Sequence, residues 1–187
     1  MTEKEKMLAQ ELYDADHDGE LIKERTRVKD ICFEYNNTKP SNMEKRKELM
    51  KQIIGNIKGN FLIEQPFMCD YGYNIEIGEN FYANHNLIIL DANKVKFGDN
   101  VLIGPNCSFY TSGHPTDVKL RKQYLEYAKP IEIGSNVWIG GNVIVLPGVK
   151  IGDNVVIGAG SVVTKDIPAN SIAVGNPCKV VRENRSI

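Results

Sequence analysis

The sequence lacks the features that mark a metal, redox, nucleic-acid or membrane protein. Its four cysteines are scattered and form no Cys-x-x-Cys pair, which argues against a zinc or thiol-exchange site and favours reduced thiols in the cytoplasm. The 23 Lys and Arg residues nearly balance the 24 Asp and Glu residues, so no overall basic charge favours nucleic acid or an anionic membrane. No apolar run is long enough to cross a bilayer, and the charged N-terminus is unlike a signal peptide.

The 187 residues predict one folding unit, because this length can bury a single sizeable core. Residues 1–57 are rich in good helix formers, and apolar residues recur there at helical spacing. We expect two or three short helices in this segment, one of them capped by Ser41 after Pro40. The expected organisation is a helical segment over residues 1–57 followed by a β-domain over residues 58–187.

A six-residue repeat begins at residue 75 and is clearest in the run IEIGSN VWIGGN VIVLPG VKIGDN VVIGAG SVVTKD. One phase of this repeat carries aliphatic residues every six positions: Ile133, Ile139, Val145, Ile151, Ile157 and Val163. A second phase lies two positions earlier: Ile131, Val137, Val143, Val149, Val155 and Ser161. Most hexads then carry Gly followed closely by Asn, Asp or Ser.

This period predicts a parallel β-helix. Alternate residues of a short strand face opposite sides, so each hexad can send its aliphatic residues into a core. Gly and Asn tolerate positive φ, so they supply the corner that follows. Three hexads close one triangular coil, and successive coils stack about 4.8 Å apart. The alternative, a parallel sheet with unrelated turns, does not explain so many hexads in phase.

The repeat stops over residues 110–130, where charged or bulky residues occupy the core positions. The interruption spans a multiple of six residues, so the coil can resume in register, and we expect an ordered loop that carries function. His114 lies at its start between Gly113 and Pro115, which restrain the backbone on both sides. A histidine on such a scaffold suits a general base near neutral pH, whereas the alternative is a surface histidine in a turn.

Three segments resemble the maltose and galactoside O-acetyltransferase family of hexapeptide-repeat acyltransferases, and the maltose branch in particular. They are YDADHDGELIKER at residues 13–25, CDYGYNIEIGENFYANHNL at 69–87 and GAGSVVTKDIPANSIAVGNPCKVVR at 158–182, together with the Gly-His-Pro of the loop. The resemblance implies a left-handed parallel β-helix. It also implies transfer of the acetyl group of acetyl-CoA to a sugar hydroxyl, with no metal required and His114 as general base.

The resemblance places acceptor contacts at Asp16, Asp70 and Asn84, whose carboxylate and amide groups suit sugar hydroxyls. Asp16 has the alternative role of capping the helix expected near residue 20. A further acidic position of the family falls on Ala92, which puts that acceptor contact in doubt. Glu126 is a candidate for orienting His114, with a solvated loop charge as the alternative.

The donor site implied by the resemblance comprises Gly141, Ala159, Thr164, Lys165, Lys179 and Arg182. Residues without large side chains would let the pantetheine arm lie close to the backbone, and the cations would face the phosphates of coenzyme A. Trp138 is expected to line the pantetheine channel. The resemblance also implies a homotrimer with each active site between two subunits.

Three other functions deserve comparison. A hexapeptide carbonic anhydrase would need three zinc-binding histidines, but His17, His85 and His114 form no paired motif. A non-catalytic scaffold would have no need for the His114 loop. An acetyltransferase acting on xenobiotics such as chloramphenicol or streptogramins is the main alternative, because related enzymes share a similar loop.

Overall fold

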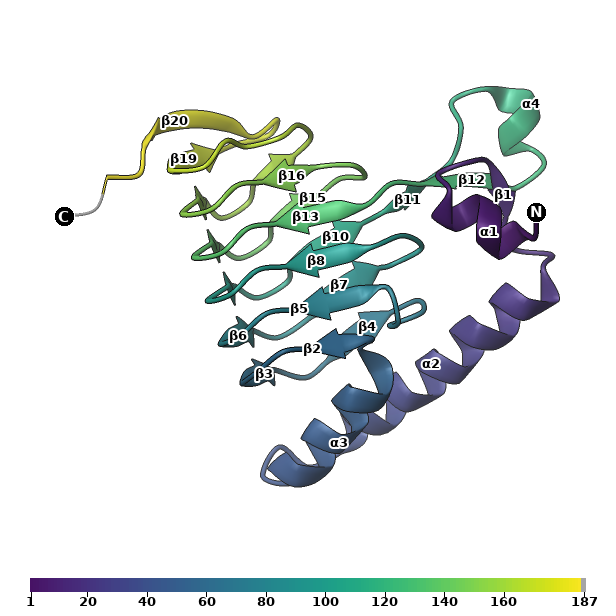
Figure 1. Ribbon diagram of the computed structural model, residues 1–187, viewed down its shortest axis with the longest axis horizontal. Coiled ribbons are helices and arrows are strands. Elements are labelled where there is room, and N and C mark those ends of the chain that lie inside the picture. The colour runs from purple at the N-terminus through teal and green to yellow at the C-terminus, as the bar shows by residue number, and fades with distance from the viewer. Residues whose placement is uncertain (186–187) are drawn as a thin grey trace.

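The computed structural model, which describes residues 1–185, is a parallel β-helix with helices packed at its N-terminal end (Figure 1). The predicted parallel β-helix and helical N-terminal segment are thus confirmed. The coils are stacked from β2 and β3 at one end to β19 and β20 at the other. None of the helices in this described part of the chain is both long and apolar enough to cross a membrane.

The coils build three sheets, which we name faces 1, 2 and 3. Face 1 contains β2 (Asn56–Ile57), β5 (Ile75–Ile77), β8 (Val95–Phe97), β13 (Ile131–Ile133) and β16 (Lys150–Ile151). Face 2 contains β3 (Phe61–Ile63), β6 (Phe81–Ala83), β9 (Leu102–Ile103), β14 (Trp138–Ile139), β17 (Val156–Ile157), β19 (Ser171–Val174) and β20 (Lys179–Glu183). Face 3 contains β4 (Phe67–Cys69), β7 (Leu87–Leu90), β10 (Ser108–Tyr110), β15 (Ile144–Val145) and β18 (Val162–Val163). All neighbours within these faces are parallel except β20, which returns antiparallel to β19.

The two predicted aliphatic phases form the core of the β-helix. Every residue of both phases is buried, including Ser161. In the earlier coils, aromatic residues fill the same column: the ring centroids of Phe97 lie 5.1 Å from those of Phe81 and 5.0 Å from those of Phe109. Edge-to-face contacts of this kind add to the burial of the rings, so the core is continuous through the stack.

Asparagine and glycine have different roles at the corners. Eight corner asparagines adopt positive φ, including Asn80, Asn100 and Asn136. Their side chains form ladders between coils, such as the 3.0 Å bond from Asn80 Nδ2 to Asn100 Oδ1. Gly98 has no positive φ, but a Cβ atom there would lie 2.7 Å from the carbonyl carbon of Gly134 on the next coil. The expectation that both residues serve positive φ is therefore corrected for Gly98, which is needed for close stacking of backbones.

The excursion over residues 110–130 folds as a small unit beside the coils. It contains β11 (Ser112–Gly113), the short helix α4 (Val118–Arg121) and β12 (Leu125–Ala128). Strand β1 (Tyr13–Asp14), from the N-terminal segment, pairs antiparallel with the other side of β12. The register resumes after the excursion, because Ile131 of β13 pairs with Val95 of β8.

Three helices make up most of the N-terminal segment: α1 (Glu3–Leu8), α2 (Gly19–Asn37) and α3 (Met43–Ile53). Asp18 caps α2 by accepting the Leu21 N–H at 2.9 Å. The N-cap of α3 is Asn42 and not the predicted Ser41, because the Asn42 side chain reaches the N–H of Lys45. As Figure 1 shows, α2 and α3 cover the first coils, while α1 lies beside β1 and the excursion.

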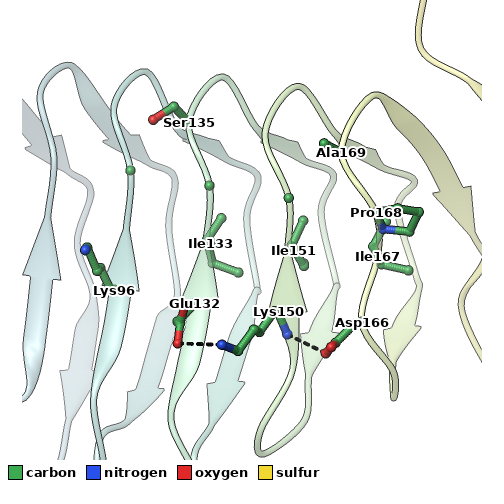
Figure 2. Close-up of a pocket in the computed structure, with 13 residues that line it drawn as sticks. Lys96, Glu132, Ile133, Ser135, Lys150, Ile151, Asp166, Ile167, Pro168 and Ala169 are labelled. Atoms are coloured by element: carbon green, nitrogen blue, oxygen red, sulfur yellow. Dashed lines mark hydrogen bonds and ion pairs between the residues drawn. The ribbon is translucent and has the colours of Figure 1, made fainter.

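The outward side chains of the three faces differ in character. Those of face 1 alternate in charge, and Figure 2 shows Glu132, Lys150 and Asp166 turned outward while Ile133, Ile151 and Ile167 point to the opposite side. Lys150 Nζ lies 3.1 Å from Glu132 Oε1, and the Lys150 N–H donates to Asp166 Oδ1. The outward row of face 2 is apolar: Leu62, Tyr82, Leu102, Trp138, Val156 and Ile172. The outward row of face 3 is also largely apolar: Met68, Ile88, Ser108, Ile144 and Val162.

Candidate active site

His114 is held at the start of the excursion with its two ring nitrogens in different surroundings. Its Nδ1 lies 3.0 Å from the carbonyl oxygen of Leu125 on β12. A carbonyl oxygen only accepts hydrogen bonds, so Nδ1 carries the proton and Nε2 of the neutral ring has a free lone pair. The side chain remains about half exposed, at 47%. The arrangement therefore presents an accessible basic nitrogen in a fixed orientation.

Glu126 lies on the side of this basic nitrogen. Its Oε1 is 3.9 Å from His114 Nε2, and its Oε2 accepts a 2.7 Å hydrogen bond from the hydroxyl of buried Tyr13. Burial raises the pKa of Glu126, and the Tyr13 hydrogen bond and His114 partly offset this effect. The orienting partner of His114 is thus the Leu125 carbonyl, whereas Glu126 faces Nε2.

Gly113 is required by a close approach within the excursion. A Cβ atom on Gly113 would lie 2.6 Å from the hydroxyl oxygen of Tyr127 and 2.8 Å from its ring. The loop beyond His114 is fastened by Arg121, whose guanidinium donates to the carbonyl oxygens of Pro115 and Thr116. Both features reduce the freedom of His114.

A polar cavity of about 300 Å³ lies beside Glu126, whose Oε1 is 3.9 Å from His114 Nε2. The cavity is lined by residues of the N-terminal segment, of the coils and of the excursion: Tyr13, Ala15, Asp16, Arg25, Lys29, Asp70, Tyr71, Leu90, Ala92, Ser112 and Glu126. Burial raises the pKa of Asp70, and the nearby cations Lys29 and Arg25 oppose this shift. The cavity therefore offers both carboxylate acceptors and cationic donors, and its lining residue Glu126 also faces His114 Nε2.

The structure brings together two of the three predicted acceptor residues, Asp16 and Asp70. Asp16 does not cap α2, since Asp18 has that role, and Asp16 Oδ1 instead lies 3.9 Å from Arg25. Asn84 lies elsewhere, at the corner after β6, where its side chain accepts the N–H of His85. Ala92 does line the cavity, while the neighbouring carboxylate of Asp91 is buried beneath it.

The predicted site residues are divided between the two edges of face 3. The excursion edge, where the strands of face 3 end, is formed by Asp70, Asp91, Thr111, Leu146 and Thr164. The glycine edge, where these strands begin, is formed by Asn84, Gly104, Gly140, Gly141 and Ala159. His114, Asp70, Thr164 and Lys165 therefore belong to the excursion edge, and Asn84, Gly141 and Ala159 to the glycine edge. Lys179 and Arg182 lie on β20 at the end of the stack.

Comparisons with known proteins agree with this architecture. Residues 6–59 match the maltose acetyltransferase hexapeptide capping motif, and residues 130–165 match the bacterial transferase hexapeptide repeats. The galactoside O-acetyltransferase of Escherichia coli is 52% identical over 163 residues, which cover 87% of this chain and 80% of that protein. The chain belongs to the maltose and galactoside O-acetyltransferase family.

Two solved structures of this family are also similar. A maltose O-acetyltransferase from Clostridium difficile 630 superposes with a TM-score of 0.97 at 52% identity and covers 100% of this chain and 99% of that one. A galactoside acetyltransferase in complex with coenzyme A gives a TM-score of 0.95 at 48% identity, with 99% and 92% of the two chains covered. The chain is thus an acetyltransferase of the maltose and galactoside O-acetyltransferase type, and its coils form the expected parallel β-helix of hexapeptide repeats.

The three histidines of this family member occupy three different surroundings. His17 Nδ1 lies 3.0 Å from Asp14 Oδ2, His85 Nδ1 lies 2.6 Å from the Gln65 carbonyl oxygen, and His114 contacts Leu125. Within residues 1–185, no group of three His, Cys, Asp or Glu side chains is arranged to hold a metal ion.

Several residues of this site were not predicted from the sequence. Tyr13, Arg25 and Tyr71 line the cavity, and Arg25 Nη1 donates to the Tyr71 hydroxyl at 2.8 Å. Tyr13 and Arg25 stand within the YDADHDGELIKER segment, so that motif was the available signal for them. Their contact with β12 and with the coils depends on long-range pairing that local spacing does not reveal.

Proposed function

We propose that this protein transfers the acetyl group of acetyl-CoA to a hydroxyl of a sugar of the glucose or maltose type, with His114 as general base. The observation that carries the proposal is the hydrogen bond from His114 Nδ1 to the Leu125 carbonyl oxygen, which leaves Nε2 free and facing Glu126, a residue that lines the polar cavity. Membership of the maltose and galactoside O-acetyltransferase family supports the same chemistry.

In the proposed reaction, His114 Nε2 removes the proton of the acceptor hydroxyl as its oxygen attacks the thioester carbonyl carbon. The tetrahedral intermediate then collapses, the carbon–sulfur bond breaks, and the leaving thiolate takes the proton from Nε2. The products are the acetyl ester and coenzyme A, with no covalent enzyme intermediate. The carboxylate of Glu126, 3.9 Å from Nε2, would stabilise the imidazolium while it carries the proton.

The cavity supports a sugar as acceptor because its polar groups match hydroxyls. Asp16 and Asp70 offer oxygens that accept from hydroxyl groups, and Arg25 and Lys29 offer donors. A xenobiotic acceptor remains the alternative, but it would place more apolar surface against these charged groups. Asn84 would contact the acceptor only from a second subunit, since it lies on the glycine edge.

Binding of acetyl-CoA is proposed along the later coils. Gly141 and Ala159 are stacked on the glycine edge, where the Gly160 N–H donates to the Gly141 carbonyl oxygen at 2.9 Å. Their small side chains would let the pantetheine arm lie along the backbone, beside the 56% exposed Trp138. Exposed Lys179 and Arg182 on β20 would then face the phosphates, and exposed Thr164 and Lys165, which lie on the excursion edge, would reach them from a neighbouring copy.

A homotrimer would unite the two edges of face 3. Exposed apolar side chains lie on face 2 (Leu102, Trp138) and on face 3 (Met68), and an apolar groove lined by Phe33, Met68 and Ile88 runs between α2 and face 3. Two different apolar patches on each copy fit a heterologous contact that closes into a ring. Such a ring would bring the glycine edge of one copy to the excursion edge of the next.

The four free cysteines, all buried, are also compatible with the proposed cytoplasmic location.

The test is release of coenzyme A from acetyl-CoA, followed with a thiol reagent. Glucose, maltose, a β-galactoside and chloramphenicol are offered in parallel to the wild type and to His114→Ala. We expect turnover with glucose or maltose that falls at least about a hundredfold in the variant, the usual contribution of a general base. Acetyl-CoA binding measured by calorimetry should stay unchanged in His114→Ala, which separates loss of the base from loss of the fold. Turnover with chloramphenicol alone would reject the sugar acceptor, and full activity of the variant would reject the mechanism.

A further inference from the structure

Asp91 is a buried carboxylate that the proposed reaction does not use. It follows β7 on the excursion edge, and its side chain is fully buried. Its Oδ1 accepts two backbone hydrogen bonds from the preceding coil, one from the N–H of Asp70 at 3.0 Å and one from the N–H of Tyr71 at 2.9 Å. Its Oδ2 has no hydrogen-bond partner among the described residues.

The two residues held by Asp91 both line the polar cavity. Asp70 contributes a carboxylate to it, and the Tyr71 hydroxyl accepts the hydrogen bond from Arg25, another lining residue. The segment that carries them leaves β4 and turns toward the next strand, so its backbone N–H groups need partners outside a regular ladder. Asp91 supplies one oxygen for both and so fixes the backbone of the cavity wall from beneath.

This arrangement costs stability that a purely structural clamp would not require. A buried carboxylate with an unpartnered oxygen is unfavourable, and burial raises the pKa of Asp91 to about 7. At another corner of the same coils, a carboxylate accepts a backbone N–H without being buried. There, exposed Asp99 accepts the N–H of Glu79 at 2.9 Å and remains in contact with water.

We propose that Asp91 is a positioning residue of the acceptor site, which acts through the backbone of Asp70 and Tyr71. The Asp91 side chain does not itself line the cavity. Its paired hydrogen bonds hold the Asp70 carboxylate and the Tyr71–Arg25 pair in the arrangement that binds the hydroxyls of the acceptor. The inference rests on the proposed function, because it assigns the polar cavity to the acceptor.

The experiment compares Asp91→Ala, Asp91→Asn and Asp99→Ala with the wild type. Asp91→Ala removes the oxygen that accepts the N–H groups of Asp70 and Tyr71, whereas Asp91→Asn keeps one accepting oxygen in a side chain of the same size. Asp99→Ala removes a similar hydrogen bond to a backbone N–H at a different corner, that of Glu79. If Asp91→Ala does not fold, Asp91→Leu replaces it, because leucine fills the space without an acceptor. The readouts are kcat, the KM for the acceptor and the KM for acetyl-CoA. They are measured with whichever acceptor of the panel the wild type acetylates.

We expect the acceptor KM to rise about tenfold in Asp91→Ala, the effect of losing two ordinary hydrogen bonds. Asp91→Asn should keep the acceptor KM within about threefold of the wild type, and Asp99→Ala should not change it. In Asp91→Ala, kcat and the KM for acetyl-CoA should stay within about twofold, since His114 and the later coils are untouched. Equal losses in all three parameters, or an unchanged acceptor KM, would overturn the proposal.

Backbone amide exchange gives a second readout that needs no substrate. The amides of Asp70 and Tyr71 should exchange faster in Asp91→Ala than in the wild type, while amides of the later coils stay protected. Unchanged protection at both amides would show that Asp91 does not hold this segment, and would also overturn the proposal. If the wild type acetylates chloramphenicol and no sugar, the sugar acceptor is rejected, and Asp91 is judged by these amides and by the KM for chloramphenicol.

Discussion

The hydroxyl of Tyr13 donates a 2.7 Å hydrogen bond to the carboxylate of Glu126, a residue 113 positions later in the chain. This bond reinforces the antiparallel pairing of β1 with β12, in which Tyr13 and Glu126 are direct partners. The N-terminal segment thereby supports the strand whose Leu125 carbonyl orients His114. The site consequently depends on a contact between the N-terminal segment and the excursion.

Removing this hydroxyl tests the connection. Tyr13→Phe is expected to lower the free energy of unfolding by about 1–2 kcal/mol, because it breaks a hydrogen bond to a carboxylate inside the fold. We also expect kcat to fall, since Glu126 loses the group that fixes it beside His114. Urea unfolding and steady-state kinetics measure the two effects. Tyr124→Phe is the control, because Tyr124 lies in the same excursion and is 57% exposed; equal effects in both variants would remove any special role for Tyr13.

A side chain at Gly113 should disturb the orientation of His114. In Gly113→Ala the new Cβ would meet the Tyr127 side chain at 2.6 Å, so β11 or the ring must shift. We expect kcat to fall about tenfold or more, because displacement of a catalytic group by a fraction of an ångström is costly. Adding Tyr127→Ala should restore part of the activity by making room. Gly19→Ala is the matched control, since a Cβ there has no atom within 4 Å, and a failure of Tyr127→Ala to restore activity would argue against the steric cause.

Asp91 should make stability depend on pH in a defined direction. Burial raises the pKa of Asp91 to about 7 in the folded protein from the ordinary 3.8 of an aspartate side chain, so folding favours the protonated form. Ionisation of the Asp91 carboxyl therefore disfavours the folded state. The free energy of unfolding is unaffected by this group below about pH 4 and decreases as the pH rises toward 7. The free energy of unfolding of Asp91→Asn minus that of the wild type should therefore increase by about 2.5 kcal/mol between pH 5 and pH 8. Urea denaturation at both pH values measures this difference, and a constant difference would contradict the assignment.

The apolar outward row of face 2 should be needed for assembly. Trp138→Lys places a charge on this row, where Trp138 is 56% exposed in the single chain, and burial of an unpaired charge is unfavourable. We expect a trimer for the wild type and a smaller species for the variant by light scattering. Lys96→Ala on charged face 1 is the control and should leave the mass unchanged. A monomeric, fully active wild type would reject the proposed assembly.

The sequence by itself determined the β-helix, because a period of six forces alternate residues into a core whatever the surroundings. Both aliphatic phases, the interruption after Phe109 and the position of His114 at its start follow from local spacing alone. The same period could not distinguish glycine from asparagine at the corners. That difference depends on which backbone atoms of the next coil lie close, as at Gly98.

Only the tertiary structure decided how His114 is oriented and which groups face it. The Leu125 carbonyl, Glu126 and Tyr13 meet through antiparallel pairing of β1, β12 and β11, and such pairing has no fixed sequence separation. The cavity likewise draws Asp16 and Arg25 from the N-terminal segment and Asp70 from the coils. Asn84 shares the motif of Asp70 but lies on the opposite edge of face 3, because between them β5 and β6 carry the chain across faces 1 and 2.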